Sequence, residues 1–217
     1  MQLLTVDISG SKALFEIESQ GRVEQYKIGT SETFNVDSLN TQITELEQDY
    51  GLKDYALAIA VPGLVQQNTL VACKSLPGLK GLTPKQLLTK AKRTLIVNDS
   101  DAAMQALLEP KQQCELLLMC DTGIGMSIAI NGKPFTGASG VAGELGHCRV
   151  MTESGDFSVK QLASGESIAA RNLSTDAELY RAGSYLGMGL AWAVNLFNPC
   201  RIHLAGNLMI RSEERRV

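Results

Sequence analysis

The chain has 217 residues, 44% of them apolar and 20% charged, which is the composition of a globular protein with one large domain or two modest ones. The net charge of −3 and a pI near 5.5 give no electrostatic reason to expect nucleic acid or an anionic membrane as a partner. No apolar run reaches the roughly 18 residues that a membrane span needs, and no signal-peptide pattern begins the chain, so we expect a cytoplasmic protein.

The first half of the chain alternates apolar strands with helical patterns. The apolar strand at 3–8 is followed by a segment that alternates like its partner strand. Thr83 and Pro84 resemble an N-cap with proline in the first turn, which predicts a helix. The expected elements are strands at 3–8, 13–17, 55–61 and 94–97 and helices at 39–50, 83–92 and 102–108.

The second half repeats this pattern after residues 109–112, which are the best candidate for a boundary between lobes 1–110 and 111–217. Asn131-Gly132 is a strong signal for a hairpin turn. Small residues in a long apolar helix, namely Gly183, Gly187 and Gly189, are expected to let helix and sheet approach closely. The expected elements are strands at 115–120, 127–130 and 201–205 and a helix at 176–196, which together predict an α/β fold with two similar lobes.

Two similar glycine-containing turns each follow an apolar strand, at Asp7–Lys12 and at Asp121–Gly125. Backbone N–H groups bind phosphate well, and glycine or small residues allow the close approach that presents them. The duplication therefore predicts two phosphate-binding turns. Asp7 and Asp121 could hold the hydration shell of Mg²⁺.

A polar segment, Asn98–Asp101, follows the short strand expected at 94–97. A carboxylate at the C-terminal end of a strand lies where α/β folds place catalytic groups, and a phosphoryl acceptor needs a base for its hydroxyl proton. The alternative is that Asn98 or Asp101 only caps the following helix. The two interpretations weigh equally, and Asp99 and Asp101 could serve one role each.

A glycine-rich loop at Gly137–His147 carries two polar groups, Glu144 and His147, three residues apart. Hydrogen-bonding groups spaced in this way suit the vicinal hydroxyls of a sugar. A metal site at His147-Cys148 is disfavoured, because adjacent residues rarely ligate together and no Cys pair follows. The five cysteines are scattered without a C-x-x-C pair, so reduced thiols are expected.

These motifs, in this order, resemble those of the ROK family of sugar kinases and sugar-responsive repressors, within the actin/hexokinase-like superfamily. The most diagnostic segment is Gly137–His147, which closely matches the signature G-A-x-G-x-A-G-E-x-G-H, and the similarity runs from residue 2 to about residue 210. The other matches are Asp7–Lys12 with D-x-G-G-T-K, Asn98–Ala103 with N-D-x-N-A-A, Thr122–Gly125 with the second phosphate loop, and Asn195–Pro199 and Leu204–Gly206 with the stretch that leads into the adenosine site.

The resemblance implies two lobes of ribonuclease H-like fold with a cleft between them, the second lobe being shortened. It implies ATP-dependent phosphorylation of a hexose or N-acetylhexosamine with Mg²⁺ as cofactor, Asp99 as general base, and lobes that close over both ligands to exclude water. A homodimer is also compatible with it. The implied sugar-binding residues are Asn98, Glu144, His147, Ser75 and Gly63, and the implied ATP-binding residues are Asp7, Gly10, Ser11, Lys12, Thr122, Gly123 and Gly206, with Mg²⁺ at Asp7.

The chain also departs from the family pattern. The region of the family's zinc-binding cysteines, here 153–159, contains no cysteine, which implies that zinc is absent. Lys160 stands where a sugar-binding glutamate is expected, Ser75 where an asparagine is expected, and Ala205 and Asn207 flank Gly206 in the nucleoside motif. These departures favour the alternative of a non-catalytic sugar-binding or sensing protein. A repressor is less favoured, because no helix-turn-helix pattern precedes the first strand.

Overall fold

The computed structural model describes residues 2–19, 21–109 and 113–209, and it divides into two compact units, Met1–Ala102 and Ala103–Val217. The predicted boundary between residues 110 and 111 stays a prediction, because residues 110–112 lie outside the described ranges. The predicted cleft between the lobes likewise stays a prediction. Within the described ranges, no helix is long and apolar enough to cross a membrane.

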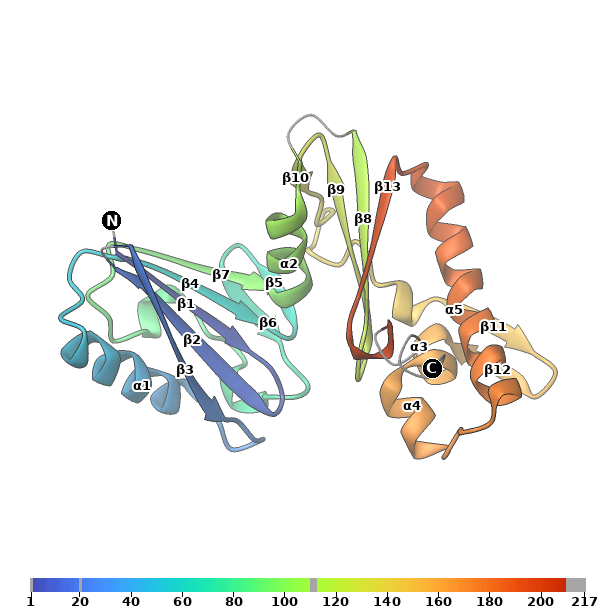
Figure 1. The fold of residues 1–217 in the computed structure, drawn as a ribbon, viewed down its shortest axis with the longest axis horizontal. Helices are drawn as coiled ribbons and strands as arrows, with labels where there is room; N and C mark the ends of the chain where they lie inside the picture. The colour runs from blue at the N-terminus through green and yellow to red at the C-terminus, as the bar shows by residue number, and fades with distance from the viewer. Residues whose placement is uncertain (1, 20, 110–112, 210–217) are drawn as a thin grey trace. The chain divides into compact units, whose positions relative to one another are not determined.

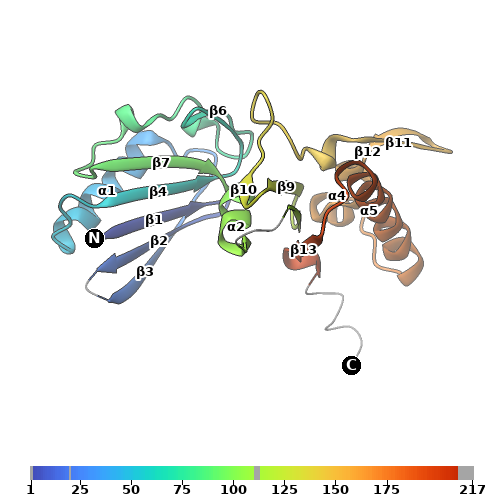
Figure 2. The ribbon, with the colours of Figure 1, turned by 90° about the horizontal axis from the view of Figure 1, so that it is seen from above.

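The first unit is built on a five-stranded mixed sheet in the order β3-β2-β1-β4-β7. Three strands form an antiparallel meander, and β4 and β7 then run parallel to β1. Figure 1 and Figure 2 show the strands side by side in this order. The strands are β1 (Leu3–Ile8), β2 (Lys12–Ser19), β3 (Arg22–Gly29), β4 (Ala56–Val61) and β7 (Arg93–Asn98). Four of them confirm the strands expected from the sequence, and β3 was not expected.

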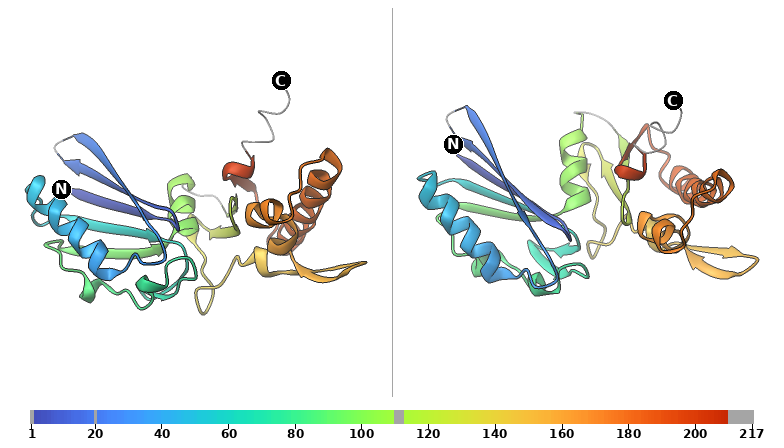
Figure 3. Two further views of the ribbon diagram at one scale, coloured as in Figure 1. Left: turned by 90° about the horizontal axis from the view of Figure 1, so that it is seen from below. Right: turned by 60° about the horizontal axis from the view of Figure 1, so that its bottom comes forward.

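Helix α1 (Val36–Asp49) covers one face of this sheet, as the blue helix in Figure 3 shows. Asn35 caps it by accepting a hydrogen bond from the Ser38 N–H at 3.0 Å. Its apolar positions Leu39 and Ile43 are fully buried, which is the helical spacing expected from the sequence. They join one core with the inward-facing residues of the strands, including Leu4, Val6, Ile8, Phe15, Leu57 and Ile59.

The helix expected at 83–92 is wrong, because only a single 3-10 turn forms at Pro84–Gln86. The backbone N–H groups that would continue the helix are taken by side chains of α1. Leu88 N–H donates to Asn40 Oδ1 at 2.8 Å, and Lys90 N–H donates to Glu47. These buried acceptors keep residues 87–92 out of a helix, because satisfying a buried carboxylate and amide outweighs the local helical preference.

A small hairpin of β5 (Leu64–Gln66) and β6 (Thr69–Ala72) follows β4, and a second 3-10 turn lies at Pro77–Leu79. Gly63 is required where this hairpin begins, because a Cβ there would lie 2.2 Å from the Ala72 carbonyl oxygen. The hairpin was not expected from the sequence.

The second unit repeats the topology of the first with one strand fewer among the described residues. Its sheet has the order β10-β9-β8-β13, with an antiparallel meander followed by a parallel strand. This is the pattern of β3-β2-β1-β4 in the first unit. The strands are β8 (Cys114–Cys120), β9 (Ile124–Ile130), β10 (Lys133–Pro134) and β13 (Arg201–Ala205), and Asn131 and Gly132 form the expected hairpin turn with positive φ.

The remaining elements of the second unit lie between β10 and β13. They are a hairpin of β11 (Arg149–Thr152) and β12 (Gly155–Ser158), the short helices α3 (Val159–Ala163) and α4 (Gly165–Ala170), and the long helix α5 (Asp176–Phe197). Helix α2 (Asp99–Leu107) starts three residues earlier than the expected 102 and spans the division between the units. A core of residues from β8, β9, α3 and α5 holds the unit together.

The expectation for the glycines of α5 is wrong for two of them. A Cβ at Gly183 or Gly187 would meet nothing within 4 Å, so no neighbour requires a small residue there. Gly189 is buried, but a Cβ there would contact the side chains of Leu145 and Val159 at 3.5 Å, not the sheet. The pattern identified the helix correctly, but these glycines do not serve its approach to the sheet.

Candidate active site

The three parallel strands of the first unit, β1, β4 and β7, end at one edge of its sheet (Figure 2). Several of the predicted site residues lie at or just after these strand ends. The register pairs Asp7 of β1 with Ala60 of β4, and Val61 of β4 with Asn98 of β7. Asp7 is therefore next to the last residue of β1, Asn98 is the last residue of β7, and Gly63 follows the end of β4. Polar groups at the carboxyl ends of parallel strands are where α/β sheets bind ligands. The sequence predicted the residues, and the register explains why they are neighbours.

Asn98 caps α2 with its side chain. Its Oδ1 accepts hydrogen bonds from the backbone N–H groups of Ser100 at 2.9 Å and Asp101 at 3.2 Å, and its Nδ2 donates to the Gly63 carbonyl oxygen at 3.0 Å. The suggestion that Asp101 is the cap is therefore wrong, and the cap is Asn98. The same amide ties the start of α2 to the segment that follows β4, which fixes Asp99, the first residue of the helix.

Asp99 is the first residue of α2, and its carboxylate is half-buried. Its Oδ1 accepts a hydrogen bond from the Ser100 N–H at 2.8 Å. Burial raises the pKa of Asp99, the negative charge of Asp7 raises it further, and the Ser100 hydrogen bond opposes both. A carboxylate with a raised pKa at a fixed position is suited to accept a proton from a hydroxyl.

The turn between β1 and β2 is tightened by its own serine. Ser9 N–H and Ser9 Oγ donate to the Lys12 carbonyl oxygen at 2.8 and 3.0 Å, so this hydroxyl is used within the turn. Gly10, Ser11 and Lys12 are exposed. A Cβ at Gly10 would lie 3.4 Å from Ser75 Cβ, which places the predicted first phosphate turn next to the predicted sugar residue Ser75.

The second phosphate turn is shorter than expected, because Ile124 and Gly125 already belong to β9. The turn is Asp121–Gly123, closed by a hydrogen bond from the Asp121 N–H to the Gly123 carbonyl oxygen at 3.0 Å. Thr122 is exposed, and a Cβ at Gly123 would meet nothing within 4 Å. The hydroxyl and the open glycine present a surface that a phosphate could approach.

Glycines from three separate segments pack their backbones against this turn and the strands that flank it. A Cβ at Gly143, with φ +92°, would lie 2.0 Å from the Met126 carbonyl oxygen, and a Cβ at Gly206, with φ +106°, would lie 2.2 Å from that of Cys120. Gly146 and Gly165 would collide in the same way with the carbonyl oxygens of Ile124 and Asp121, at 2.5 and 2.6 Å. Gly143 and Gly146 of the signature, together with Gly165 and Gly206, therefore serve close backbone packing around the turn.

Three hydrogen bonds to the turn, two from α4 and one from Asn207, are not predicted by the sequence. The N–H groups of Gly165 and Glu166, at the start of α4, donate to the carbonyl oxygens of Asp121 and Thr122 at 2.9 and 3.0 Å. Asn207 Nδ2 donates to Asp121 Oδ1 at 3.1 Å. Asn207 was noticed only as a departure from the family pattern, and only the pairing of β13 with β8 brings it to Asp121.

Glu144 and His147 lie at a single 3-10 turn, Leu145–His147. Glu144 Oε2 and His147 Nε2 are 3.6 Å apart, and their side chains are 57% and 75% exposed, while Leu145 is buried beneath them. The pair is thus presented to solvent by a turn that is anchored in the core. Lys160, which replaces the expected glutamate, forms an ion pair with Glu166 of α4 at 3.6 Å.

Divalent metal ligands are sparse in the described ranges, where no group of three His, Cys, Asp or Glu side chains is arranged to hold a metal ion. The expected absence of zinc stays a prediction. Asp7 is exposed beside Asp99 in the first unit. One or two carboxylates completed by phosphate oxygens and water are the usual ligand set of Mg²⁺, and Asp7 could serve as such a carboxylate.

Comparison with known proteins agrees with the motifs. A family model described as ROK family matches residues 4–213. An N-acetylmannosamine kinase of Haemophilus influenzae (strain PittEE) is 32% identical over 157 residues, which cover 68% of this chain and 52% of the kinase. An N-acetyl-D-glucosamine kinase of Salmonella paratyphi C is 28% identical over 204 residues, which cover 86% of this chain and 63% of that kinase. The chain thus spans about half to two thirds of the length of these relatives.

A solved structure confirms the fold. A ROK family glucokinase from Streptomyces griseus, in complex with glucose and AMPPNP, matches with a TM-score of 0.70 at 19% identity, covering 96% of this chain and 84% of the glucokinase. The two units therefore have the actin/hexokinase-like fold expected from the motifs, in a chain shorter than that of the glucokinase.

Proposed function

The chain belongs to the ROK family, and on this premise we propose that it phosphorylates a hexose or an N-acetylhexosamine with ATP as phosphoryl donor. The observation that carries the proposal is the environment of Asp99, whose half-buried carboxylate has a raised pKa. The cap of α2 holds Asp99 in place directly after the end of β7. The names of the relatives, which are kinases of N-acetylated hexosamines, support this substrate class.

In the proposed reaction, Asp99 accepts the proton of the sugar hydroxyl as that oxygen attacks the terminal phosphate. Asn98 acts chiefly by holding Asp99 through the cap, since both polar atoms of its side chain bond to the backbone. Glu144 and His147 are proposed to bind sugar hydroxyls, because their side chains are exposed and their turn is rigidly seated. Ser75 and Gly63 are proposed to line the sugar site beside Gly10 and Asn98.

ATP would supply the phosphoryl group, and Mg²⁺ bound with it would neutralise part of the phosphate charge. We assign its binding to the two turns: Thr122, Gly123 and Gly206 in the second unit and Gly10, Ser11 and Lys12 in the first. Asp7 is the proposed Mg²⁺ ligand. A cytoplasmic location, a homodimer and the absence of a nucleic-acid partner remain predictions.

A substrate screen tests the proposal. ATP consumption is measured with glucose, N-acetylglucosamine, N-acetylmannosamine, mannose, fructose and allose, and turnover is expected with at least one of them. Sugar binding without turnover across the panel would instead favour the sensing protein that Lys160 and Ala205 suggest. The ion pair of Lys160 with Glu166 favours this second candidate, because it replaces the acceptor of a sugar hydroxyl with a paired cation.

Asp7→Asn is expected to move the acid limb of the kcat/KM profile to lower pH. The rate falls as pH drops through the raised pKa of Asp99, because the base must be deprotonated, and removing the Asp7 charge lowers that pKa. The maximal rate is expected to fall as well, because Asp7 is the proposed Mg²⁺ ligand. The profile measured is that of kcat/KM for ATP, so that the acid limb reports the protein before ATP and its Mg²⁺ bind, with Asp37→Asn on α1 as the control. An acid limb that stays in place or moves to higher pH would contradict the charge coupling.

Asn207→Ala is expected to raise KM for ATP about fivefold and to leave KM for the sugar unchanged, since the lost hydrogen bond to Asp121 is worth roughly 1 kcal/mol. Asn207→Asp should raise it more, because it sets two carboxylates against each other. Steady-state kinetics with each substrate varied measures both constants, and Gln105→Ala on α2 is the control. Equal changes in both KM values would mean that Asn207 does not act through the phosphate turn.

A further inference from the structure

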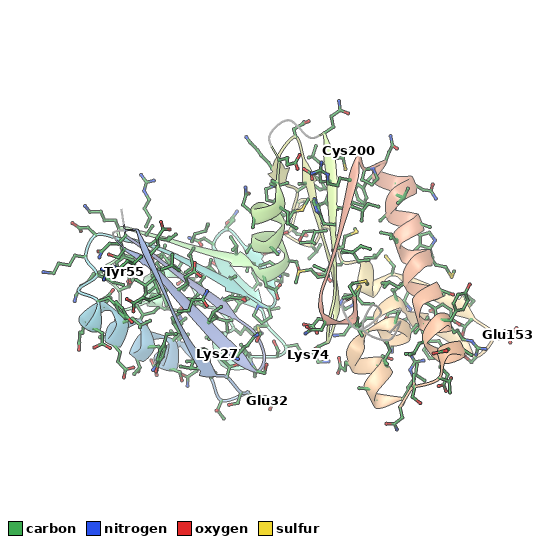
Figure 4. The ribbon with its side chains drawn as sticks, in the orientation of Figure 1. Lys27, Glu32, Tyr55, Lys74, Glu153 and Cys200 are labelled. Carbon is green, nitrogen blue, oxygen red and sulfur yellow. The ribbon has the colours of Figure 1, made fainter. Side chains whose placement is uncertain are left out.

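The starts of β8 and β13 bring two cysteines side by side. The strands run parallel, and the first residue of β13, Arg201, is paired with Glu115. Cys200 and Cys114 each precede that pair by one position, and the Cys200 N–H donates to the Cys114 carbonyl oxygen at 2.9 Å. Figure 4 labels Cys200 at the start of β13, beside the start of β8.

Neighbouring positions on parallel strands suit a disulfide. Strands lie about 4.8 Å apart and paired residues point to the same face, while disulfides join Cα atoms about 4.4–6.8 Å apart. The Cys200 thiol already donates to the Cys114 carbonyl oxygen, with Sγ 3.0 Å from that oxygen. Neither cysteine is in a disulfide in the structure, and their adjacent strand positions place the two backbones within reach of a bridge.

The two thiols differ in their access to solvent. Cys200 is exposed, whereas Cys114 is partly buried. Burial raises the pKa of the Cys114 thiol, and the neighbouring Cys200 and Glu115 raise it further. A dissolved oxidant therefore meets Cys200 first, and Cys114 is placed to react with the product.

We propose that Cys114 and Cys200 form a reversible disulfide when the protein meets a peroxide. The Cys200 thiolate attacks one oxygen of hydrogen peroxide, the O–O bond breaks, and the leaving oxygen takes up protons to become water while Cys200 becomes a sulfenic acid. The Cys114 sulfur then attacks the Cys200 sulfur. The S–S bond forms, the S–O bond breaks, and the departing hydroxide leaves as a second water with the Cys114 proton. Two thiols are oxidised and one peroxide is reduced, and a dithiol such as dithiothreitol reverses the reaction.

The bridge would fasten β13, which pairs only with β8 among the described strands. It closes a segment with a separation of 86 residues, and closing a long segment restricts the unfolded chain. It lies at the opposite end of both strands from the Asp121–Gly123 turn. The oxidised protein is therefore expected to melt at a higher temperature.

The test uses the whole chain, oxidised with stoichiometric hydrogen peroxide and digested under non-reducing conditions. A linked Cys114–Cys200 peptide, lighter by two hydrogens than its parts, is expected to exceed every other cysteine pairing about tenfold, and dithiothreitol should remove it. The melting temperature should rise on oxidation and return on reduction.

Cys200→Ser is expected to abolish both the linked peptide and the rise in melting temperature, and the exposed position makes the change mild. Cys148→Ser is the matched control, because Cys148 is an exposed thiol in the same unit, and it should leave both readouts intact. The proposal is overturned if peroxide produces only sulfinic acid, only covalent dimers, or links between other cysteines. None of these readouts depends on kinase activity.

Discussion

Asp99→Asn is expected to lower kcat for sugar phosphorylation by about 10²–10⁴-fold, which is the range of a general base, and to leave the Kd for the sugar within about threefold. Asparagine keeps the acceptor oxygen that bonds to the Ser100 N–H, so the start of α2 should not change. Only the ability to take a proton is removed. Kinetics gives the loss of rate, and calorimetric titration of the non-reacting protein with sugar gives the affinity.

The same substitution is expected to leave stability at pH 7 unchanged or higher. The raised pKa of Asp99 means that the folded protein holds its proton more tightly than the unfolded chain, so unfolding free energy falls as pH rises from the ordinary aspartate range through the raised pKa. Above that window the ionised carboxylate is a net cost of the folded state, and Asp99→Asn removes it. A variant that is both inactive and less stable would point to a damaged fold.

Two further variants locate the effect. Asp37→Asn changes an exposed first-turn acid of α1, far in sequence from the site, and should leave kcat unchanged. Asp101→Asn changes the other acid in the first turn of α2. If Asp101→Asn abolished turnover and Asp99→Asn did not, the base would be Asp101, and the present assignment would be wrong.

Gly143→Ala is expected to destabilise the second unit by about 3–5 kcal/mol. The new Cβ would lie 2.0 Å from the Met126 carbonyl oxygen, and the residue has φ +92°, where alanine is strained. The nearest atoms belong to the backbone of Met126 and Ser127, not to a flexible side chain, so the loop must move away from β9. Urea denaturation measures the loss, and Trp192, the single tryptophan, reports on this unit from α5.

Gly187→Ala is the matched control for this prediction. It lies inside α5 with nothing within 4 Å of the new Cβ, so alanine should stabilise the helix by about 0.5–1 kcal/mol. Opposite signs for the two glycines are the expected result. A Gly143→Ala protein as stable as the parent would show that the signature glycine has no packing role.

The sequence predicted β1, β2, β4, β7, β8, β9 and β13, because buried strands carry periodic signals that are local, and it did not predict β3 or the short strands β5, β6, β10, β11 and β12. It was less successful where long-range contacts override local preference. Residues 87–92 look helical, but Asn40 and Glu47 of α1 take their N–H groups. No pattern within residues 83–92 predicts these two acceptors, which lie 48 and 43 positions earlier in the chain than the N–H groups that they bind.

The candidate site shows the same division. The residue types of Asn98 and Asp99 were legible, but the hydrogen bond from Asn98 to the Gly63 carbonyl oxygen, 35 positions earlier in the chain, was not. A role for Asn98 in sugar binding stays a prediction. The contact of Asn207 with Asp121 depends on the register of β13 against β8, which no local pattern encodes. Residue types therefore predicted the candidate site residues, whereas the hydrogen-bond partners of their side chains depended on the fold.

The backbone packing of Gly143, Gly146, Gly165 and Gly206 bears on how such proteins are recognised. Each glycine is required by a nearby carbonyl oxygen of the chain itself, whether or not any substrate is bound. A descendant that ceased to transfer phosphate would still need all of them in order to fold. The glycines by which the family is detected thus reflect the packing of its fold. A search with this signature will therefore find catalytic and non-catalytic members alike.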